Sequence, residues 1–301
     1  MSWHHPFGST ARDGWDVVVE PDSSGWEHTG MYAGRLADGD TRTLDAGHRE
    51  HLVVPLSGSV HVAVSGAAGE HEAKLAGRSS VFAGASDVAY VPAGSSLTVT
   101  AVGEARVAVV FAVTETADAR FPFRHVAAED VPVELRGAGI ASREVRNFGI
   151  PGVLEADSII ACEVITPGGN WSSWPPHKHD EERPGEETAL EEIYYFQVAP
   201  SAGTPEAAAT DPIAYQRVYG TEHRPIDVLA EVRDGDVVLV PHGWHGPAIA
   251  APGYDLYYLN VRAGPGEERA WLICDDPAHG WVRETWADQP TDPRLPLGGA
   301  R

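Results

Sequence analysis

The chain has 301 residues, of which 43% are hydrophobic, which is enough apolar material for two ordinary folded domains. Acidic residues outnumber basic ones by 44 to 22, and the resulting net charge of −22 argues against partners that need clustered positive charge, namely nucleic acid and anionic membranes. The amino terminus lacks a basic region followed by an apolar run, and no stretch is apolar for the length of a membrane span, so we expect a cytoplasmic protein.

The predicted elements are almost all strands. Those of the first half are short apolar runs bounded by glycine, serine and aspartate, at residues 52–56, 60–64, 97–101 and 107–111. Those of the second half are similar, at residues 159–165, 193–198, 215–219, 237–240 and 256–261. No long stretch has helical periodicity, so the sequence predicts an all-β chain. Cys162 and Cys274 are too few for a disulfide framework, and we expect both to be reduced.

An internal repeat relates the two halves of the chain. Residues 87–96 match residues 236–245 at their Asp-Val, Val-Pro and Gly positions. The match places Ser96 where His245 stands in the second half. The second half therefore has a chemically active side chain that the first half lacks.

A second match supports the same division. Residues 50–54 resemble residues 191–195, but no His-x-His sequence precedes them in the first half. We predict two related domains, residues 1–135 and residues 136–301, and expect only the second to bind a metal.

The candidate metal ligands begin with His177 and His179, which are two positions apart and share one face if they lie on a strand. Such a pair on its own is more often two packing or surface histidines than a metal site. His245 follows a Pro-x-Gly turn and supplies a third imidazole, although His242 within that turn is an alternative. Three convergent imidazoles favour the metal-site interpretation.

A carboxylate ligand is expected just before an aromatic strand. Alternation places Glu192 on the same face as Tyr194 and places Glu191 with Tyr195. We prefer Glu192, but the phase of the strand is not visible in the sequence, so Glu191 stays open.

The duplicated strand, Pro-x-Gly turn and strand fit a double-stranded β-helix, or jelly-roll, barrel, and the pattern resembles the cupin superfamily. Residues 235–245 match the second cupin motif, except that one residue rather than two separates Gly243 from His245. In the first motif Glu192 stands thirteen positions after His179, which is longer than the usual cupin gap. We expect the intervening acidic residues 180–187 to form a loop at the barrel mouth.

A closer resemblance covers nearly the whole chain. The segments that carry it are residues 141–169, 170–181, 191–195, 216–219 and 254–261, together with 24–26 and 54–58. They resemble the family of 5-deoxy-glucuronate isomerases of inositol catabolism, whose bicupin relatives, the isomerases of 5-keto-4-deoxyuronate, bind zinc through three His and one Glu. The resemblance implies two barrels and a single divalent metal ion held by four ligands: His177, His179, Glu192 and His245. Zinc is the first choice, manganese or iron could bind the same ligands, and no organic cofactor is implied.

The reaction implied by the resemblance converts an aldose, 5-deoxy-D-glucuronate, into a ketose, 5-dehydro-2-deoxy-D-gluconate. It needs a base, an acid and a group that stabilises charge on oxygen. Glu192 is the candidate base, and Tyr194 and Tyr258 are candidates for the acid. Arg217 and Lys178 are candidates for binding the carboxylate of a small anionic sugar acid, and Arg217 is preferred because its guanidinium matches a planar carboxylate.

Two other functions remain open. A metal-dependent dioxygenase of the pirin or quercetinase type would use nearly the same ligands, and a non-catalytic sugar-binding cupin would bind without turnover. We expect the first domain to act through packing, as structural support, as a pocket wall or as part of a homo-oligomer surface.

Overall fold

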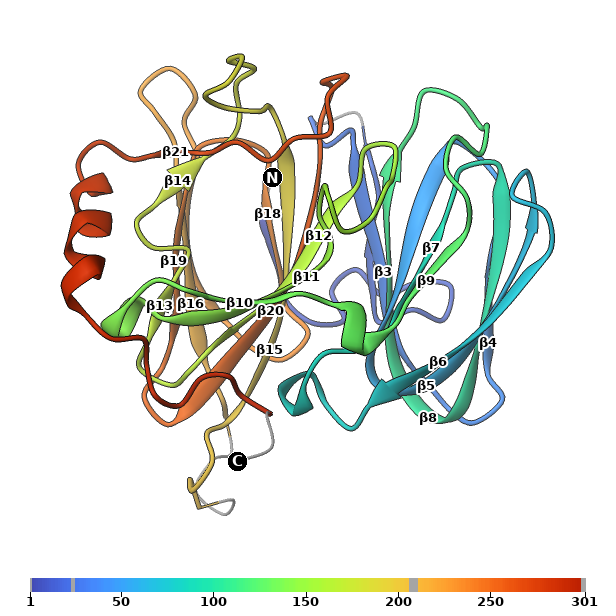
Figure 1. Ribbon diagram of the computed structural model, residues 1–301, viewed down its shortest axis with the longest axis horizontal. Helices are drawn as coiled ribbons and strands as arrows, with labels where there is room; N and C mark the ends of the chain where they lie inside the picture. The colour runs from blue at the N-terminus through green and yellow to red at the C-terminus, as the bar shows by residue number, and fades with distance from the viewer. Residues whose placement is uncertain (1, 23–24, 206–210, 299–301) are drawn as a thin grey trace.

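The computed structural model describes residues 2–22, 25–205 and 211–298, which form two β-barrels lying side by side (Figure 1). The prediction of an all-β bicupin is confirmed. The described helical segments are three 3₁₀ helices of 3 residues each, η1 Val81–Ala83, η2 Ala128–Asp130 and η3 Gly139–Ala141, and one of 9 residues, η5 Gly280–Asp288. η5 lies at the end of the second barrel farthest from the first. Within the described ranges, no helix is long and apolar enough to cross a membrane.

The first barrel is one curved sheet with the strand order β2-β3-β8-β5-β7-β9, in which β4 adds to β8 and β6 adds to β5. Its strands are β2 Val17–Val19, β3 Thr29–Leu36, β4 Thr41–Leu44, β5 Arg49–Gly66, β6 His71–Arg78, β7 Val88–Val91, β8 Ser95–Val113 and β9 Arg124–Val126. The sequence predicted β5 and β8 as two short strands each, and the structure joins each pair into one long strand that bends from one side of the barrel to the other.

The bend in β5 depends on a glycine. The pairing register of β5 with β8 shifts between Pro55 and Ser59, and Gly58 between them has a φ of 74°. A Cβ atom on Gly58 would lie 2.2 Å from the carbonyl oxygen of Glu104. Only glycine fits this close approach of two backbones, which lets the sheet curl.

The second barrel has two sheets. The first has the order β1-β18-β15-β20-β12-β11-β10 and contains β1 His4–His5, β10 Val133–Arg136, β11 Arg143–Gly149, β12 Ile160–Thr166, β15 Glu191–Pro200, β18 Val237–Val240 and β20 Tyr254–Ala263. The second has the order β17-β16-β19-β14-β21 with β13 on β19, and contains β13 Trp171–Ser172, β14 His177–Lys178, β16 Ala214–Tyr219, β17 Asp227–Val232, β19 Trp244–Ala250 and β21 Cys274–Asp275. Because all of β10 pairs with β11, the division predicted between residues 135 and 136 falls inside a strand of the second barrel.

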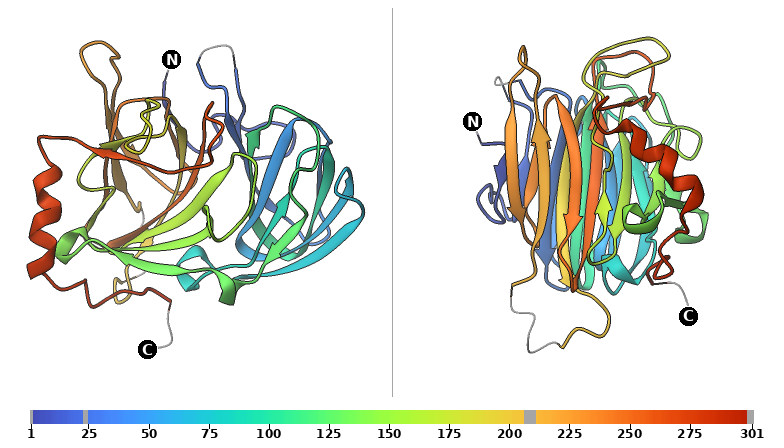
Figure 2. Two further views of the ribbon diagram at one scale, coloured as in Figure 1. Left: turned by 45° about the horizontal axis from the view of Figure 1, so that its top comes forward. Right: turned by 90° about the vertical axis from the view of Figure 1, so that its left-hand side faces the viewer.

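The apolar core consists of three clusters, of which one connects the two barrels. One fills the first barrel, one fills the second, and a third lies between the barrels and draws residues from both. Neighbouring residues of one strand serve different clusters: Tyr194 packs inside the second barrel, whereas Ile193 and Tyr195 pack between the barrels. The facing strands are therefore buried on both sides, and Figure 2 shows the two barrels side by side.

Two carboxylates at matched positions of the repeat link the barrels reciprocally. The carboxylate of Glu50, in the first barrel, accepts hydrogen bonds of 2.6–2.7 Å from the backbone N–H groups of residues 157–159 in the second. The carboxylate of Glu191, in the second barrel, accepts hydrogen bonds of 2.6–3.0 Å from the backbone N–H groups of residues 27–29 in the first. Glu191 therefore faces the other barrel, and the next residue, Glu192, faces its own barrel's interior.

Candidate metal centre

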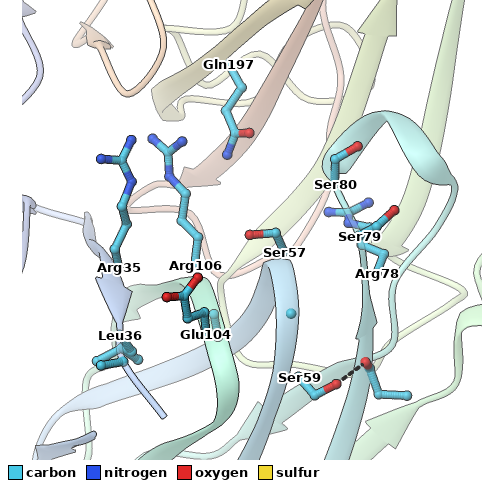
Figure 3. A pocket seen from close by; sticks show the side chains of 14 residues that line it. Arg35, Leu36, Ser57, Ser59, Arg78, Ser79, Ser80, Glu104, Arg106 and Gln197 are labelled. Carbon is cyan, nitrogen blue, oxygen red and sulfur yellow. Dashed lines mark hydrogen bonds between the residues drawn. The ribbon is translucent and has the colours of Figure 1, made fainter.

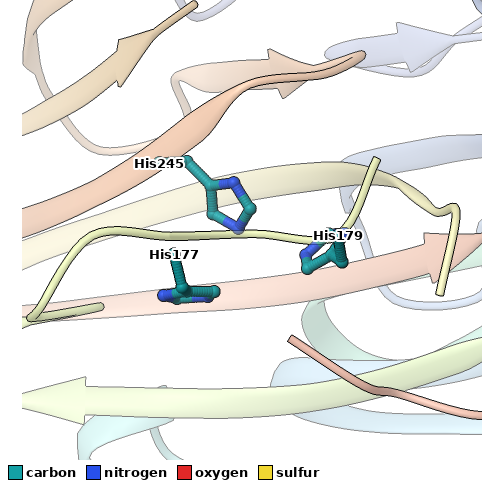
Figure 4. Close-up of side chains that lie close together, drawn as sticks. All are labelled: His177, His179 and His245. Carbon is teal, nitrogen blue, oxygen red and sulfur yellow. The ribbon is translucent and has the colours of Figure 1, made fainter. Parts of the chain in front are cut away.

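Three imidazoles converge inside the second barrel, as Figure 4 shows. β14 pairs with β19 so that His177 lies directly opposite His245, and His179 follows two positions along the same segment. The ring centroids of His177 and His179 lie 4.5 and 4.6 Å from that of His245, and one nitrogen from each ring lies within 4.8 Å of the others. All three side chains are buried. The structure thus brings together the three histidines that the sequence singled out, with His245 rather than His242 as the third.

Hydrogen bonds to the backbone set the orientation of each ring. In every case Nδ1 lies near a carbonyl oxygen: Pro175 at 3.4 Å from His177, Leu190 at 3.1 Å from His179 and Gly243 at 3.1 Å from His245. Because a carbonyl can only accept, Nδ1 carries the proton and the lone pair of Nε2 is free. Burial lowers the pKa of His245 and lowers that of His177 well below its ordinary value, which keeps both rings in the neutral form that binds metals.

Glu192 completes the cluster. Its Oε2 atom lies 2.9 Å from Nε2 of His179 and 3.0 Å from Nε2 of His245. Burial opposes ionisation of this carboxyl, but the adjacent Arg262 guanidinium outweighs burial and holds the pKa of Glu192 well below its ordinary value. With Nδ1 protonated, Nε2 of His245 and the Glu192 oxygen are two acceptors in contact, and Nε2 has no hydrogen-bond donor among the described atoms. Such a donor set fits a divalent cation, although the ligand role of the four residues stays a prediction.

The two candidate tyrosines meet next to the imidazoles. The hydroxyl oxygens of Tyr194 and Tyr258 each lie 3.2 Å from Oγ of Ser173, so the three groups form one hydrogen-bonded chain. Burial raises the pKa of Tyr258, and raises that of Tyr194 well above its ordinary value, so both phenols are neutral. Tyr258 and Ser173 line a cavity beside the cluster, whereas Tyr194 lies behind them against His245.

The cavity has a volume of about 460 Å³, within the usual range of small-molecule sites. His177 lies in its wall, and so do four arginines that the sequence interpretation missed: Arg136, Arg143, Arg262 and Arg283. Arg262 could have been found, because alternation along β20 from Tyr258 places Asn260 and Arg262 on the same face. The other three come from separate segments, whose convergence no sequence spacing reveals.

Comparison with known proteins identifies the family. Residues 3–282 match the model of the KduI/IolB family. The chain belongs to the KduI/IolB family. Relatives named 5-deoxy-glucuronate isomerase include one from Geobacillus kaustophilus, 40% identical over 93% of this chain and 95% of its own, and one from Bacillus subtilis strain 168, 37% identical over 83% of this chain and 85% of its own.

One solved structure agrees with this KduI/IolB assignment, and a second shares only the fold. An IolB-like protein from Salmonella typhimurium LT2 has a TM-score of 0.81 at 32% identity, covering 94% of this chain and 99% of its own. Oxalate decarboxylase from Lactobacillus farciminis, in complex with formate, has a TM-score of 0.57 at 13% identity over 82% of this chain and 79% of its own. The likeness to oxalate decarboxylase shows a shared fold only.

This KduI/IolB family member does not bring the predicted carboxylate-binding residues to the cavity. The structure corrects the predicted position of Arg217. Its neighbours Gln216 and Val218 point into the barrel, so Arg217 lies on the outer face, where it pairs with Asp227.

Lys178 is likewise directed elsewhere. Its ammonium group lies 2.7 Å from Asp180 and 2.8 Å from Glu187, and it sits over the ring of Trp244. These contacts hold the loop of residues 180–187 against the strand that carries the proposed ligand His177, which is a structural role. A substrate carboxylate would meet two carboxylates at this position.

A larger cavity, about 980 Å³, lies between the barrels, and its wall includes none of the three imidazoles (Figure 3). Its arginines are engaged: Arg78 with Glu163, and both Arg35 and Arg106 with Asp234. Of these two cavities, only the smaller combines an imidazole, that of His177, with a neutral phenol, that of Tyr258, and guanidinium groups in its described wall, and it is therefore the candidate active site of this family member.

Proposed function

We propose that the protein is a 5-deoxy-glucuronate isomerase that converts 5-deoxy-D-glucuronate into 5-dehydro-2-deoxy-D-gluconate. The observation that carries this proposal is the match to relatives of that name over most of both chains, at up to 40% identity. The buried cluster of three imidazoles and one carboxylate, open to a cavity lined by arginines, supports it. The substrate would be a small anionic sugar acid.

We infer that the isomerase depends on a divalent metal ion held by His177, His179, Glu192 and His245. Zinc is the first choice for this donor set, and manganese and iron are the alternatives. When bound, the ion would supply Lewis-acid stabilisation of charge on the substrate's carbonyl and hydroxyl oxygens.

The side chains around the proposed metal ion would have different roles in the reaction. One carboxylate oxygen of Glu192 pairs with Arg262 and the other lies against the Nε2 atoms of the imidazoles, so Glu192 suits metal binding better than proton abstraction. Tyr258 lies in the cavity wall as a neutral phenol, which can donate a hydrogen bond or a proton to a substrate oxygen. Ser173 connects it to Tyr194, so the pair can pass a proton between the cavity and the interior.

Proton NMR of 5-deoxy-D-glucuronate with the purified protein in deuterated water would test the proposal. We expect the 5-keto product to appear, to stop appearing after chelation, and to reappear when zinc or manganese is restored. Deuterium in the product would indicate an enediol rather than a hydride shift. Absence of product with every metal would reject the isomerase, and oxygen consumption with a sugar acid would favour a cupin dioxygenase instead.

A further inference from the structure

The four arginines around the candidate active-site cavity differ in their partners. Three of them are paired with carboxylates of the protein: Arg136 with Glu134 at 2.7 Å, Arg283 with Asp275 at 2.7 Å and Arg262 with Glu192. Arg143 has no carboxylate within 4.0 Å in the described part of the chain. It is the cation of this cavity that lacks an anionic partner.

Arg143 is nevertheless fixed in place. It begins β11, and its Nη1 donates to the carbonyl oxygen of Ala141 at 3.0 Å and lies 3.5 Å from that of Trp174. Its guanidinium carbon lies 5.6 Å from the ring centroid of Trp286. The Trp174 contact ties it to the segment that carries the ligand His177. These contacts use one of its terminal nitrogens and leave donors for a ligand.

A buried cation without an anion is costly for a protein to retain. Only 6% of Arg143 is exposed, and burial lowers its pKa to about 10, so it is still charged at neutral pH. Arg143 therefore destabilises the unliganded protein, and a carboxylate entering the cavity would supply the missing partner. A planar guanidinium is suited to hold that carboxylate through paired hydrogen bonds.

We propose that Arg143 binds the carboxylate of the sugar acid and thereby determines specificity for acids over neutral sugars. This inference rests on the proposed isomerase function. An open-chain hexuronate has its reacting carbons at one end and its carboxylate at the other. Anchoring the carboxylate at Arg143 leaves the reacting end to be placed beside His177 and Tyr258, which share the cavity wall with Arg143.

The test compares Arg143→Met with Arg217→Met, the same substitution at an arginine outside the cavity. Kinetics are measured with 5-deoxy-D-glucuronate and with the analogue that has a hydroxymethyl group in place of the carboxylate. For Arg143→Met we expect kcat/KM to fall about 10- to 150-fold on the acid and to change little on the analogue, because hydrogen bonds between charged groups are lost. Arg217→Met should match the unmodified enzyme on both substrates.

Direct binding gives a readout that does not depend on turnover. D-gluconate, a sugar acid, is titrated by calorimetry into each metal-loaded protein, and we expect Arg143→Met to weaken binding by a similar factor. The melting temperature of the unliganded Arg143→Met protein should equal or exceed that of the unmodified protein, because the uncompensated charge is gone. A purely structural arginine would lower it.

The outcomes separate this inference from the proposed function. Unchanged gluconate binding and unchanged discrimination in Arg143→Met would overturn the role of Arg143. If no variant isomerises the acid but Arg143→Met still loses gluconate binding, the carboxylate site stands and the isomerase assignment fails. If Arg143→Met does not fold, Arg143→Lys decides. It keeps the charge without the planar fork and should raise KM for the acid only, whereas an unchanged KM would overturn the proposal.

Discussion

The two barrels are related by the internal repeat and differ at positions that face the interior. Glu192 pairs with Val240 on one side and Arg262 on the other, and at the matching position His51 pairs with Val91 and Phe111. The second barrel thus places a carboxylate and a guanidinium where the first places an imidazole and a phenyl ring.

The consequence for the first barrel is an apolar interior. The ring centroids of His51 and Phe111 lie 5.8 Å apart, and burial lowers the pKa of His51 to about 3, so the ring is neutral. Ser96, at the position that matches His245, hydrogen-bonds to Ser65 in place of facing a cluster of imidazoles. A shared fold therefore does not imply a shared chemistry.

The residue that precedes His51 in the first barrel and Glu192 in the second has not diverged. Glu50 and Glu191 are both glutamates, and each accepts hydrogen bonds from three consecutive backbone N–H groups of the opposite barrel. Both halves of the repeat thus contribute the same kind of contact to the interface, whereas the matched residues inside the two barrels differ.

The largest effects should come from the ligand cluster, which the first barrel lacks. His177→Ala and His245→Ala should each lose nearly all bound metal and activity while both barrels stay folded, because each removes one of the four proposed ligands. Elemental analysis with circular dichroism would measure this. His51→Leu, in the first barrel, is the control and should keep full metal content. Full metal content in either ligand variant would defeat the proposed ligand set.

Removing the Arg262 guanidinium, which has no counterpart at the matched position inside the first barrel, should have the next largest effect. Arg262→Met would leave Glu192 buried without its cation, and we expect a loss of about 3–5 kcal/mol in the free energy of unfolding of the metal-free protein. Urea denaturation would measure it. Phe111→Met at the matched position of the first barrel removes no charge and should cost less, so equal losses would contradict the comparison.

Substituting either of the two matched glutamates at the interface should destabilise the protein by a similar amount. Glu50→Gln and Glu191→Gln each weaken hydrogen bonds from backbone N–H groups to a charged acceptor, so each should lower the free energy of unfolding by about 2 kcal/mol. Thermal denaturation of the two variants would show similar shifts. A large effect of one with no effect of the other would indicate that only one of the matched glutamates connects the barrels.

The ion pair between Arg78 and Glu163 also connects the barrels and should give a pH dependence. Burial opposes ionisation of Glu163, but Arg78 and the hydrogen bond from Tyr257 outweigh it and lower the pKa below the ordinary value of 4.5. The stability that this carboxylate contributes is therefore present above pH 4.5 and lost as the pH falls through the folded-state pKa. Glu163→Gln should make acid unfolding less steep below pH 4.5, as followed by tryptophan fluorescence, and an unchanged profile would exclude this pair as the cause.

The smallest effect should come from Arg217. Its partner Asp227 is solvent-exposed, so Arg217→Gln should change stability by less than about 1 kcal/mol and leave kcat/KM unchanged. Steady-state kinetics would show this, and a raised KM for the acid would restore the sequence-based assignment.

Local patterns were enough for much of the fold and for the convergence of the imidazoles. Strand periodicity and turn residues predicted the apolar runs, but not that 52–56 and 60–64 form one strand, because the bend at Gly58 is set by contact with Glu104. Spacing of two placed His177 and His179 on one face, and the Pro-x-Gly turn placed His245 nearby.

The sequence by itself determined the all-β class, the two related halves and the half that holds the histidine cluster, because strand periodicity, repeats and motif spacing are local properties. Only the tertiary structure decided which arginine can meet a substrate. Arg217 and Arg143 are both arginines in the second half of the chain. In the structure, a neighbouring carboxylate neutralises Arg217 but not Arg143, and only Arg143 lies in the wall of the cavity. Those properties depend on segments distant in the chain, since charge pairing and burial are set by what packs nearby in space.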